Sequence, residues 1–122
     1  MHRTFLTALL AGGALACAAH SGWMPTNPPP RPLEAHSPDD VALFTATMPT
    51  RAFVEVGIIS AAPGMDSNDF EVLAQLRKEG GARGCDGLIV IGTNTNTTGS
   101  SNAYGITMRE QTSFRAACIV YP

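Results

Sequence analysis

Three cysteines are the residues best suited to chemistry in this chain of 122 residues. A cysteine can accept a lipid, form a disulfide or bind a soft metal ion as its thiolate. Cys17 follows an apolar N-terminal segment, Cys85 precedes a strand-like run, and Cys118 lies near the end of the last such run. An antiparallel hairpin would place Cys85 and Cys118 at the same end of the ladder. We therefore expect a Cys85–Cys118 disulfide, with two buried thiols or a redox-active pair as the alternatives.

Groups for acid–base catalysis are sparse. The histidines, His2, His20 and His36, all lie in the predicted signal segment or linker. The predicted domain therefore lacks the imidazole that a Ser-His-Asp triad, a Cys-His pair or a His-ligated zinc site requires. Asp86 stands beside Cys85, where a role in the turn before the strand is the simpler interpretation. The sequence predicts no catalytic residue, no metal site, no cofactor and no enzymatic activity.

Residues 1–16 have the pattern of an export signal. Arg3 gives the segment a positive start, and residues 5–15 are apolar but too few to span a bilayer. Residues 14–16, Ala-Leu-Ala, fit a small-residue cleavage site. We therefore expect removal of residues 1–16 during export.

Cys17 would become the first residue after this cleavage. It resembles the cysteine of the bacterial lipobox, which is lipidated and becomes the new N-terminus, although Leu15 stands two residues before it rather than three. Ala18 resembles the pattern for sorting to an outer membrane. We expect a lipid at Cys17; the alternative is a soluble secreted protein that merely begins there.

Residues 17–40 have the composition of a linker. Five prolines fall within residues 24–32, a density that favours extended polyproline II without a packed core. At roughly 3.1 Å per residue, such a segment could hold a domain about 60 Å from its anchor. The expected partner-binding residues are Trp23, Pro25, Pro28, Pro29, Pro30 and Pro32. A passive tether is the alternative.

Residues 41–122 are expected to form one small α+β domain of order β-β-α-β-β. Strand-like runs occur at residues 41–45 and 51–60, and Val54, Val56 and Ile58 are expected to share one face of the second. The net charge of the chain is −2, with no basic cluster, so nucleic acid is not an expected partner.

A helix is expected after the second strand. Asn68 and Glu71 form a capping-box pattern at its start, and Gly80-Gly81 is expected to end it. The expected apolar stripe consists of Phe70, Leu73, Ala74 and Leu76.

The run at residues 88–91 is apolar throughout and bounded by glycines, which predicts a central strand buried on both faces. Strand, helix and strand in this order predict a parallel pair. Residues 92–102 predict a polar loop, after which strands at 104–108 and 112–121 close the sheet antiparallel. The predicted fold is a small mixed sheet with one helix packed on it and one intradomain disulfide.

The helix, the run Gly-Cys-Asp-Gly-Leu-Ile-Val at residues 84–90 and the final strand around Cys118 resemble the small domain of the Rcs-type outer-membrane stress-sensing lipoprotein. The pattern around residues 84–90 is also similar to YbjQ-like domains. The resemblance implies that Cys118 is a disulfide cysteine, that Cys17 carries the anchor and that the Pro-rich segment engages an outer-membrane β-barrel. That family has four domain cysteines in two bridges, whereas this chain has two.

Together these patterns predict a lipid-anchored outer-membrane protein that faces the periplasm and acts as a binding or envelope-sensing module without catalysis. Its expected partners are the membrane, through the lipid, and an outer-membrane β-barrel or a periplasmic protein. The alternative is a soluble or anchored module that binds a small ligand or a soft metal through Cys85 and Cys118, with Met65 or Met108 as a further ligand.

Overall fold

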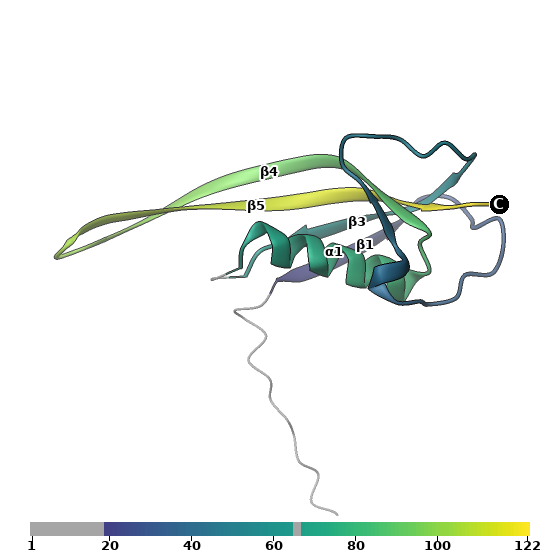
Figure 1. Ribbon diagram of the computed structural model, residues 1–122. Helices are drawn as coiled ribbons and strands as arrows, with labels where there is room; N and C mark the ends of the chain where they lie inside the picture. The colour runs from purple at the N-terminus through teal and green to yellow at the C-terminus, as the bar shows by residue number, and fades with distance from the viewer. Residues whose placement is uncertain (1–18, 65–66) are drawn as a thin grey trace, which may run out of the picture.

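The fold is a five-stranded sheet with one α-helix packed on one face (Figure 1). The computed structural model describes residues 19–64 and 67–122. The elements in chain order are β1 (His20–Pro25), the short 3-10 helix η2 (Pro38–Asp40), β2 (Ala42–Phe44), β3 (Val54–Ala62), α1 (Asp69–Arg83), β4 (Gly87–Asn102) and β5 (Gly105–Val120). The predicted α+β class, one helix on a mixed sheet, is confirmed.

The strands lie in the order β1-β3-β5-β4-β2. β3 and β4 precede and follow the helix and are parallel, as predicted, because both run antiparallel to β5 between them. β2 joins one edge in parallel with β4, and β1 joins the other edge antiparallel to β3. The middle strand is therefore β5, and the apolar run at residues 88–91, predicted as the central strand, lies beside it in β4.

Apolar side chains fill both faces of the sheet. The larger cluster lies between the sheet and α1 and includes the fully buried Ile59, Leu76 and Leu88. A smaller cluster around Ile119 lies on the other face, where Phe44, the last residue of β2 before the β2–β3 connection, packs against it. Figure 1 shows this connection arching over the side of the sheet away from α1. One layer of strands thus separates two small cores.

A β-bulge changes which residues of β3 share a face. The register of β3 against β5 shifts between Glu55 and Gly57. As a result Val56 and Ile59 belong to the helix-side cluster, whereas Ile58 belongs to the cluster on the other face. The prediction that Val56 and Ile58 share one face is wrong, because an extra residue in a bulge inverts the alternation beyond it.

Helix α1 begins as predicted but ends later. The Asn68 side chain accepts a hydrogen bond of 3.0 Å from the Glu71 N–H, which confirms the N-terminal cap. The helix then continues through Gly80 and Gly81 and is capped by Gly84 in the left-handed conformation at φ 80°. The predicted end is wrong because both glycines serve packing. A Cβ on Gly80 would crowd the Leu88 side chain of β4. A Cβ on Gly81 would crowd the backbone of residues 36–38, where the chain enters η2.

The buried stripe of α1 also differs from the predicted one. Val72 and Leu76 are fully buried, with Gly80 one turn further on, whereas Phe70 is 83% exposed. Residues four apart lie on one face of a helix at about 100° per residue, and Phe70 lies about 200° from Val72. Phe70 is therefore outside the core stripe.

The predicted linker contains a strand of the domain. β1 pairs with β3 over its whole length, from His20 opposite Ala62 to Pro25 opposite Gly57. The Ser21 hydroxyl also joins β1 to α1 through hydrogen bonds with two helix side chains. Residues 20–25 thus belong to the sheet, although the domain is predicted to begin at residue 41. The predicted spacing of about 60 Å between anchor and domain is wrong, because pairing with a strand edge competes with polyproline II.

Residues 26–38 cross one end of the domain. Hydrogen bonds fix the start of this segment, from the Thr26 N–H to the carbonyl of Val56 at 3.0 Å and from the Asn27 side chain to β3. Near its end the His36 N–H donates to the carbonyl of Gly81 at the C-terminus of α1, at 2.9 Å. The segment therefore connects the two edges of the sheet as part of the domain.

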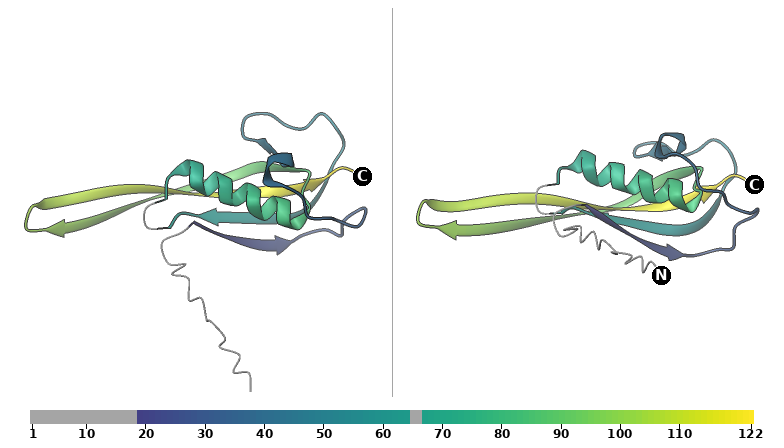
Figure 2. Two further views of the ribbon diagram at one scale, coloured as in Figure 1. Left: turned by 60° about the horizontal axis from the view of Figure 1, so that its bottom comes forward. Right: turned by 90° about the horizontal axis from the view of Figure 1, so that it is seen from below.

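β4 and β5 extend far beyond the rest of the sheet. Nine pairs, from Asn94 opposite Ser113 to Asn102 opposite Gly105, lie outside the parts of these strands that pair with β2 or β3. Figure 2 shows this two-stranded ribbon, residues 94–113, projecting past α1 and β3 in both views. The predicted polar loop at residues 92–102 is wrong, since its threonines are strong strand formers and the register supplies a partner for each residue.

Candidate functional site

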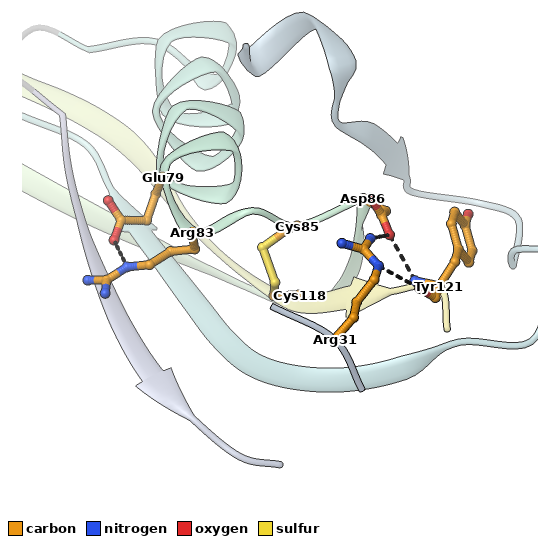
Figure 3. The surroundings of a disulfide bond; sticks show 7 residues. All are labelled: Arg31, Glu79, Arg83, Cys85, Asp86, Cys118 and Tyr121. Carbon is orange, nitrogen blue, oxygen red and sulfur yellow. Dashed lines mark hydrogen bonds and ion pairs between the residues drawn. A yellow bond between two sulfur atoms is a disulfide. The ribbon is translucent and has the colours of Figure 1, made fainter. Parts of the chain in front are cut away.

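The predicted disulfide is confirmed. Cys85, in the connection between α1 and β4, is bonded to Cys118 of β5, and their Cα atoms lie 5.5 Å apart (Figure 3). Both cysteines are fully buried in the helix-side cluster. The bond therefore joins the end of the helix to the middle strand of the sheet.

Asp86 has the structural role that its place in the sequence predicts. One of its carboxylate oxygens accepts hydrogen bonds from the Arg31 guanidinium and from the Tyr121 N–H, each 2.8 Å long (Figure 3). Arg31 also donates to the Tyr121 carbonyl at 3.2 Å, and the Arg51 guanidinium lies 4.0 Å from the centroid of the Tyr121 ring. These contacts tie the segment after β1 and the end of β5 to the turn before β4.

Trp23, predicted to contact a partner, instead packs within its own domain. It lies half-buried against the helix-side cluster, and a Cβ on Gly57 would overlap its ring. The Arg83 guanidinium at the end of α1 lies 5.1 Å from the ring centroid. This indole is therefore a core contact of β1, and its partner-binding role stays a prediction.

The other residues predicted for the linker divide into two groups. Pro25 ends β1, whereas Pro28, Pro29, Pro30 and Pro32 are exposed in the segment that crosses the end of the domain. The signal segment and Cys17 lie outside the described residues. The exposed prolines thus stay available for contact, but on the body of the domain rather than along a free tether.

The ribbon carries an apolar tip that the sequence analysis did not assign to a site. Tyr104 is 99% exposed, Ile106 74% and Met108 65%. Asn102 and Gly105 form the end of the ribbon, where the Asn102 side chain accepts a hydrogen bond of 2.9 Å from the Tyr104 N–H. Such large exposed apolar side chains on a small domain are typical of a contact surface.

The sequence of the partner strand explains why these side chains stay exposed. Ile106 pairs with Ser101 and Met108 with Gly99, so neither faces an apolar neighbour across the ladder. Further in, Thr95 and Thr112 face each other with their hydroxyl oxygens 3.1 Å apart. An apolar strand opposite a Ser- and Gly-rich one is the signal that would have revealed a half-exposed hairpin.

The soft-metal alternative loses its proposed ligands. Both domain cysteines are in the disulfide, which leaves no thiolate at either sulfur. Met108 lies ten residues before Cys118 on the same strand, about 33 Å away at the rise of a strand, and Met65 lies outside the described residues. Within residues 19–64 and 67–122, no three His, Cys, Asp or Glu side chains gather to hold a metal ion.

Two histidines belong to the folded part, contrary to the prediction. His20 begins β1, and His36 packs half-buried against the end of α1, where its Nδ1 lies 3.3 Å from the Ser37 carbonyl. In the described part of the chain, neither imidazole is hydrogen-bonded to another side chain. No nucleophile–imidazole pair can therefore be named among these residues.

None of the helices that the structure describes has the length and apolar character needed to cross a membrane. No protein-family model matches the sequence, and no curated protein matches it. Among solved structures, the fold is similar to the crystal structure of the Francisella virulence factor FvfA. The TM-score is 0.46 with 9% sequence identity, over 81% of this chain and 96% of that chain. At this TM-score the similarity carries no conclusion about function.

Proposed function

We propose that the chain is a lipid-anchored module of a bacterial outer membrane that faces the periplasm and binds a protein partner without catalysis. The observation that carries the proposal is the ribbon, which presents Tyr104, Ile106 and Met108 at the end of nine residue pairs. Among the described residues no third strand pairs with these nine pairs, and nearer the base the Gln111 side chain donates a hydrogen bond of 2.8 Å to the Gly64 carbonyl. A span of nine residues in a strand is about 30 Å long. The ribbon can therefore reach a partner that the body does not touch.

The disulfide supports an envelope location. Disulfides persist in oxidising compartments such as the periplasm and are rare in the cytosol. The Cys85–Cys118 bond is buried in the core, where it contributes to the fold. The export pattern of residues 1–16 agrees with this compartment.

A lipid at Cys17 would hold the body close to the membrane. β1 begins at His20, and Ala19 already packs against the helix-side cluster. Only two residues would then separate the anchored cysteine from the sheet, which allows only a short distance between the membrane and the body. The reach of the module away from the membrane would then come from the ribbon rather than from the Pro-rich segment.

The partner expected at the ribbon is an outer-membrane β-barrel or a periplasmic protein with an exposed strand edge. No strand within residues 19–64 and 67–122 pairs with either long edge of the ribbon, because the pairing with β2 and β3 stops before residue 94 of β4 and residue 113 of β5. Unpaired backbone N–H and C=O groups can accept an added strand, and apolar side chains beside them select it.

A photoreactive residue in place of Ile106 tests the proposal in the full chain, expressed in its own host. The matched control replaces Phe70, which is similarly exposed but lies on α1. We expect one discrete heterologous adduct from position 106 and none from position 70. The adduct should disappear when Tyr104 and Met108 are both changed to Ser.

Equal adducts from both positions would contradict a specific ribbon contact, as would their absence from position 106. An adduct of twice the mass of the chain would show that the ribbon contacts a second copy, which would also contradict a distinct protein partner.

A further inference from the structure

The face of the sheet opposite α1 has a groove of about 620 Å³ at the base of the ribbon. The strand register pairs Gly22 with Ser60, Ser60 with Arg115, and Arg115 with Gly92, so these four residues form one row across β1, β3, β5 and β4. Side chains alternate between faces along a strand. Since Ala116 belongs to the helix-side cluster, Arg115 projects from the other face.

The row is open because two of its members lack side chains. A Cβ on Gly22 or on Gly92 would meet no heavy atom within 4 Å. The next row supplies further polar groups to the groove, among them His20, Ser113 and Asn94. A volume of this size falls in the range of small-molecule sites, roughly 300 to 1,000 Å³.

The charge of the groove is opposite to that of the chain as a whole. The chain has 10 Asp+Glu against 8 Lys+Arg, yet none of the described residues that line the groove is an Asp or a Glu. Among residues 19–64 and 67–122, the Arg115 guanidinium has no hydrogen-bond or ion-pair partner. By contrast, Arg31 and Arg83 each pair with a carboxylate. Among the described residues, Arg115 is thus a cation without a charge partner, beside the open space over Gly22 and Gly92.

We propose that this groove binds a phosphate group, with Arg115 as its charge partner. A guanidinium donates two parallel N–H bonds to a phosphate, and such charge-assisted bonds are about twice as strong as neutral ones. The hydroxyls of Ser60 and Ser113 and the amide of Asn94 are the further donors that phosphate oxygens accept. The open space over Gly22 accommodates the rest of the ligand.

The phosphate can come from a phospholipid headgroup or from a soluble phosphate ester. His20 lines the groove three residues after Cys17, so an anchored chain would hold this face near lipid headgroups. Only this choice of source rests on the proposed anchoring. The site itself depends on residues of the sheet and would bind phosphate in an unanchored protein as well.

The test uses the full exported chain with Cys17→Ser, so that vesicle binding does not depend on an attached lipid. Calorimetric titration with glycerol 3-phosphate measures the soluble source, and co-sedimentation with vesicles of phosphatidylglycerol and phosphatidylcholine in equal parts measures the lipid source. Arg115→Gln removes the charge, and Gly22→Val fills the groove while favouring a strand. Lys78→Gln, on exposed α1 surface, is the matched control for the loss of one positive charge.

We expect Arg115→Gln and Gly22→Val to weaken phosphate binding roughly tenfold to a hundredfold, as expected for a lost charge-assisted hydrogen bond. Lys78→Gln should leave it within about twofold, since screening weakens distant exposed charges. If both the vesicles and glycerol 3-phosphate bind in an Arg115-dependent way, the phosphate is assigned to lipid headgroups. If only glycerol 3-phosphate binds in this way, the phosphate is assigned to a soluble ligand.

Three results would overturn the phosphate site. The first is no saturable binding of either probe. The second is equal weakening by Arg115→Gln and Lys78→Gln, which would indicate attraction to the overall charge. The third is unchanged binding by Gly22→Val, which would place the phosphate elsewhere. If phosphate binding depends on Arg115 and Gly22 as expected while no crosslink forms from position 106, only the proposed protein partner is rejected.

Discussion

The inner and outer halves of β4 and β5 have opposite environments. In the inner half Leu88 and Cys118 pair across the ladder, and both are fully buried. In the outer half Ser101 pairs with Ile106, and both are exposed. The same two strands thus pass from a core with helix and disulfide to a ribbon that is exposed on both faces toward its tip.

This difference separates stability from contact. The body contains the buried clusters, the disulfide and the Arg31–Asp86 and Arg83–Glu79 ion pairs, whereas the ribbon contributes little buried apolar area. Folding free energy depends mainly on buried area, so changes in the body should alter stability and changes at the tip should not. Binding should respond in the opposite way.

The largest expected effect is the loss of the disulfide. The double change Cys85→Ala and Cys118→Ala opens a sequence separation of 33 residues. In the chain-entropy model this should lower the free energy of unfolding by about 3 to 4 kcal/mol. Urea unfolding followed by circular dichroism measures it, with the reduced wild-type protein as control. A loss below about 1 kcal/mol would show that the body does not depend on this bond.

The next effect tests whether β1 belongs to the body. Gly57→Ala should lower the free energy of unfolding by about 1 to 3 kcal/mol, because the added Cβ overlaps the Trp23 ring. The matched control is Gly22→Ala, also in the β1–β3 pair, where the Cβ meets nothing within 4 Å. Thermal melting compares the two. Equal stability of both variants would indicate that residues 20–25 are not packed on the sheet.

A smaller effect is expected at the turn before β4. Asp86→Asn removes the negative charge of the carboxylate that accepts hydrogen bonds from Arg31 and the Tyr121 N–H. Because the ion pair is partly exposed, we expect a loss of about 1 kcal/mol in urea unfolding. The control Asp39→Asn makes the same change at an exposed carboxylate of η2. A double-mutant cycle with Arg31→Ala should give a measurable coupling; additive effects would contradict the contact.

The smallest effect on stability is expected at the ribbon tip. The triple variant Tyr104→Ser, Ile106→Ser and Met108→Thr should have a free energy of unfolding within about 0.5 kcal/mol of the wild type, because all three side chains are exposed. Differential scanning calorimetry measures this change. A loss of several kcal/mol would show that the tip packs against the body and would remove the distinction between the two regions.

The fold was predictable where one local pattern decides the structure. The Asn68 cap and the cysteine pair each gave a correct prediction, and the apolar run at residues 88–91 correctly indicated a strand, although β5 and not β4 is the middle one. The bulge in β3 was not predictable, since the run at residues 54–60 fits either face equally well. The strand in residues 20–25 was also hidden, because five nearby prolines favour a linker and only the free edge of β3 provides its partner.

The candidate site was less predictable than the fold. The ribbon depends on pairing residues 94–102 with residues 105–113, whereas the Asn, Gly and Ser residues of this polar segment favour a loop. The phosphate groove depends on four strands that bring Gly22, Ser60, Arg115 and Gly92 into one row. Neither arrangement leaves a short sequence motif.

The most direct test of the account is an intact mass of the protein from membranes of its own host, with alkylation before and after reduction. We predict a chain that begins at a lipid-modified Cys17, takes up no alkyl group without reduction and takes up two after it, at Cys85 and Cys118. An unlipidated chain whose two cysteines are alkylated without reduction would contradict the anchored, disulfide-bonded binding module.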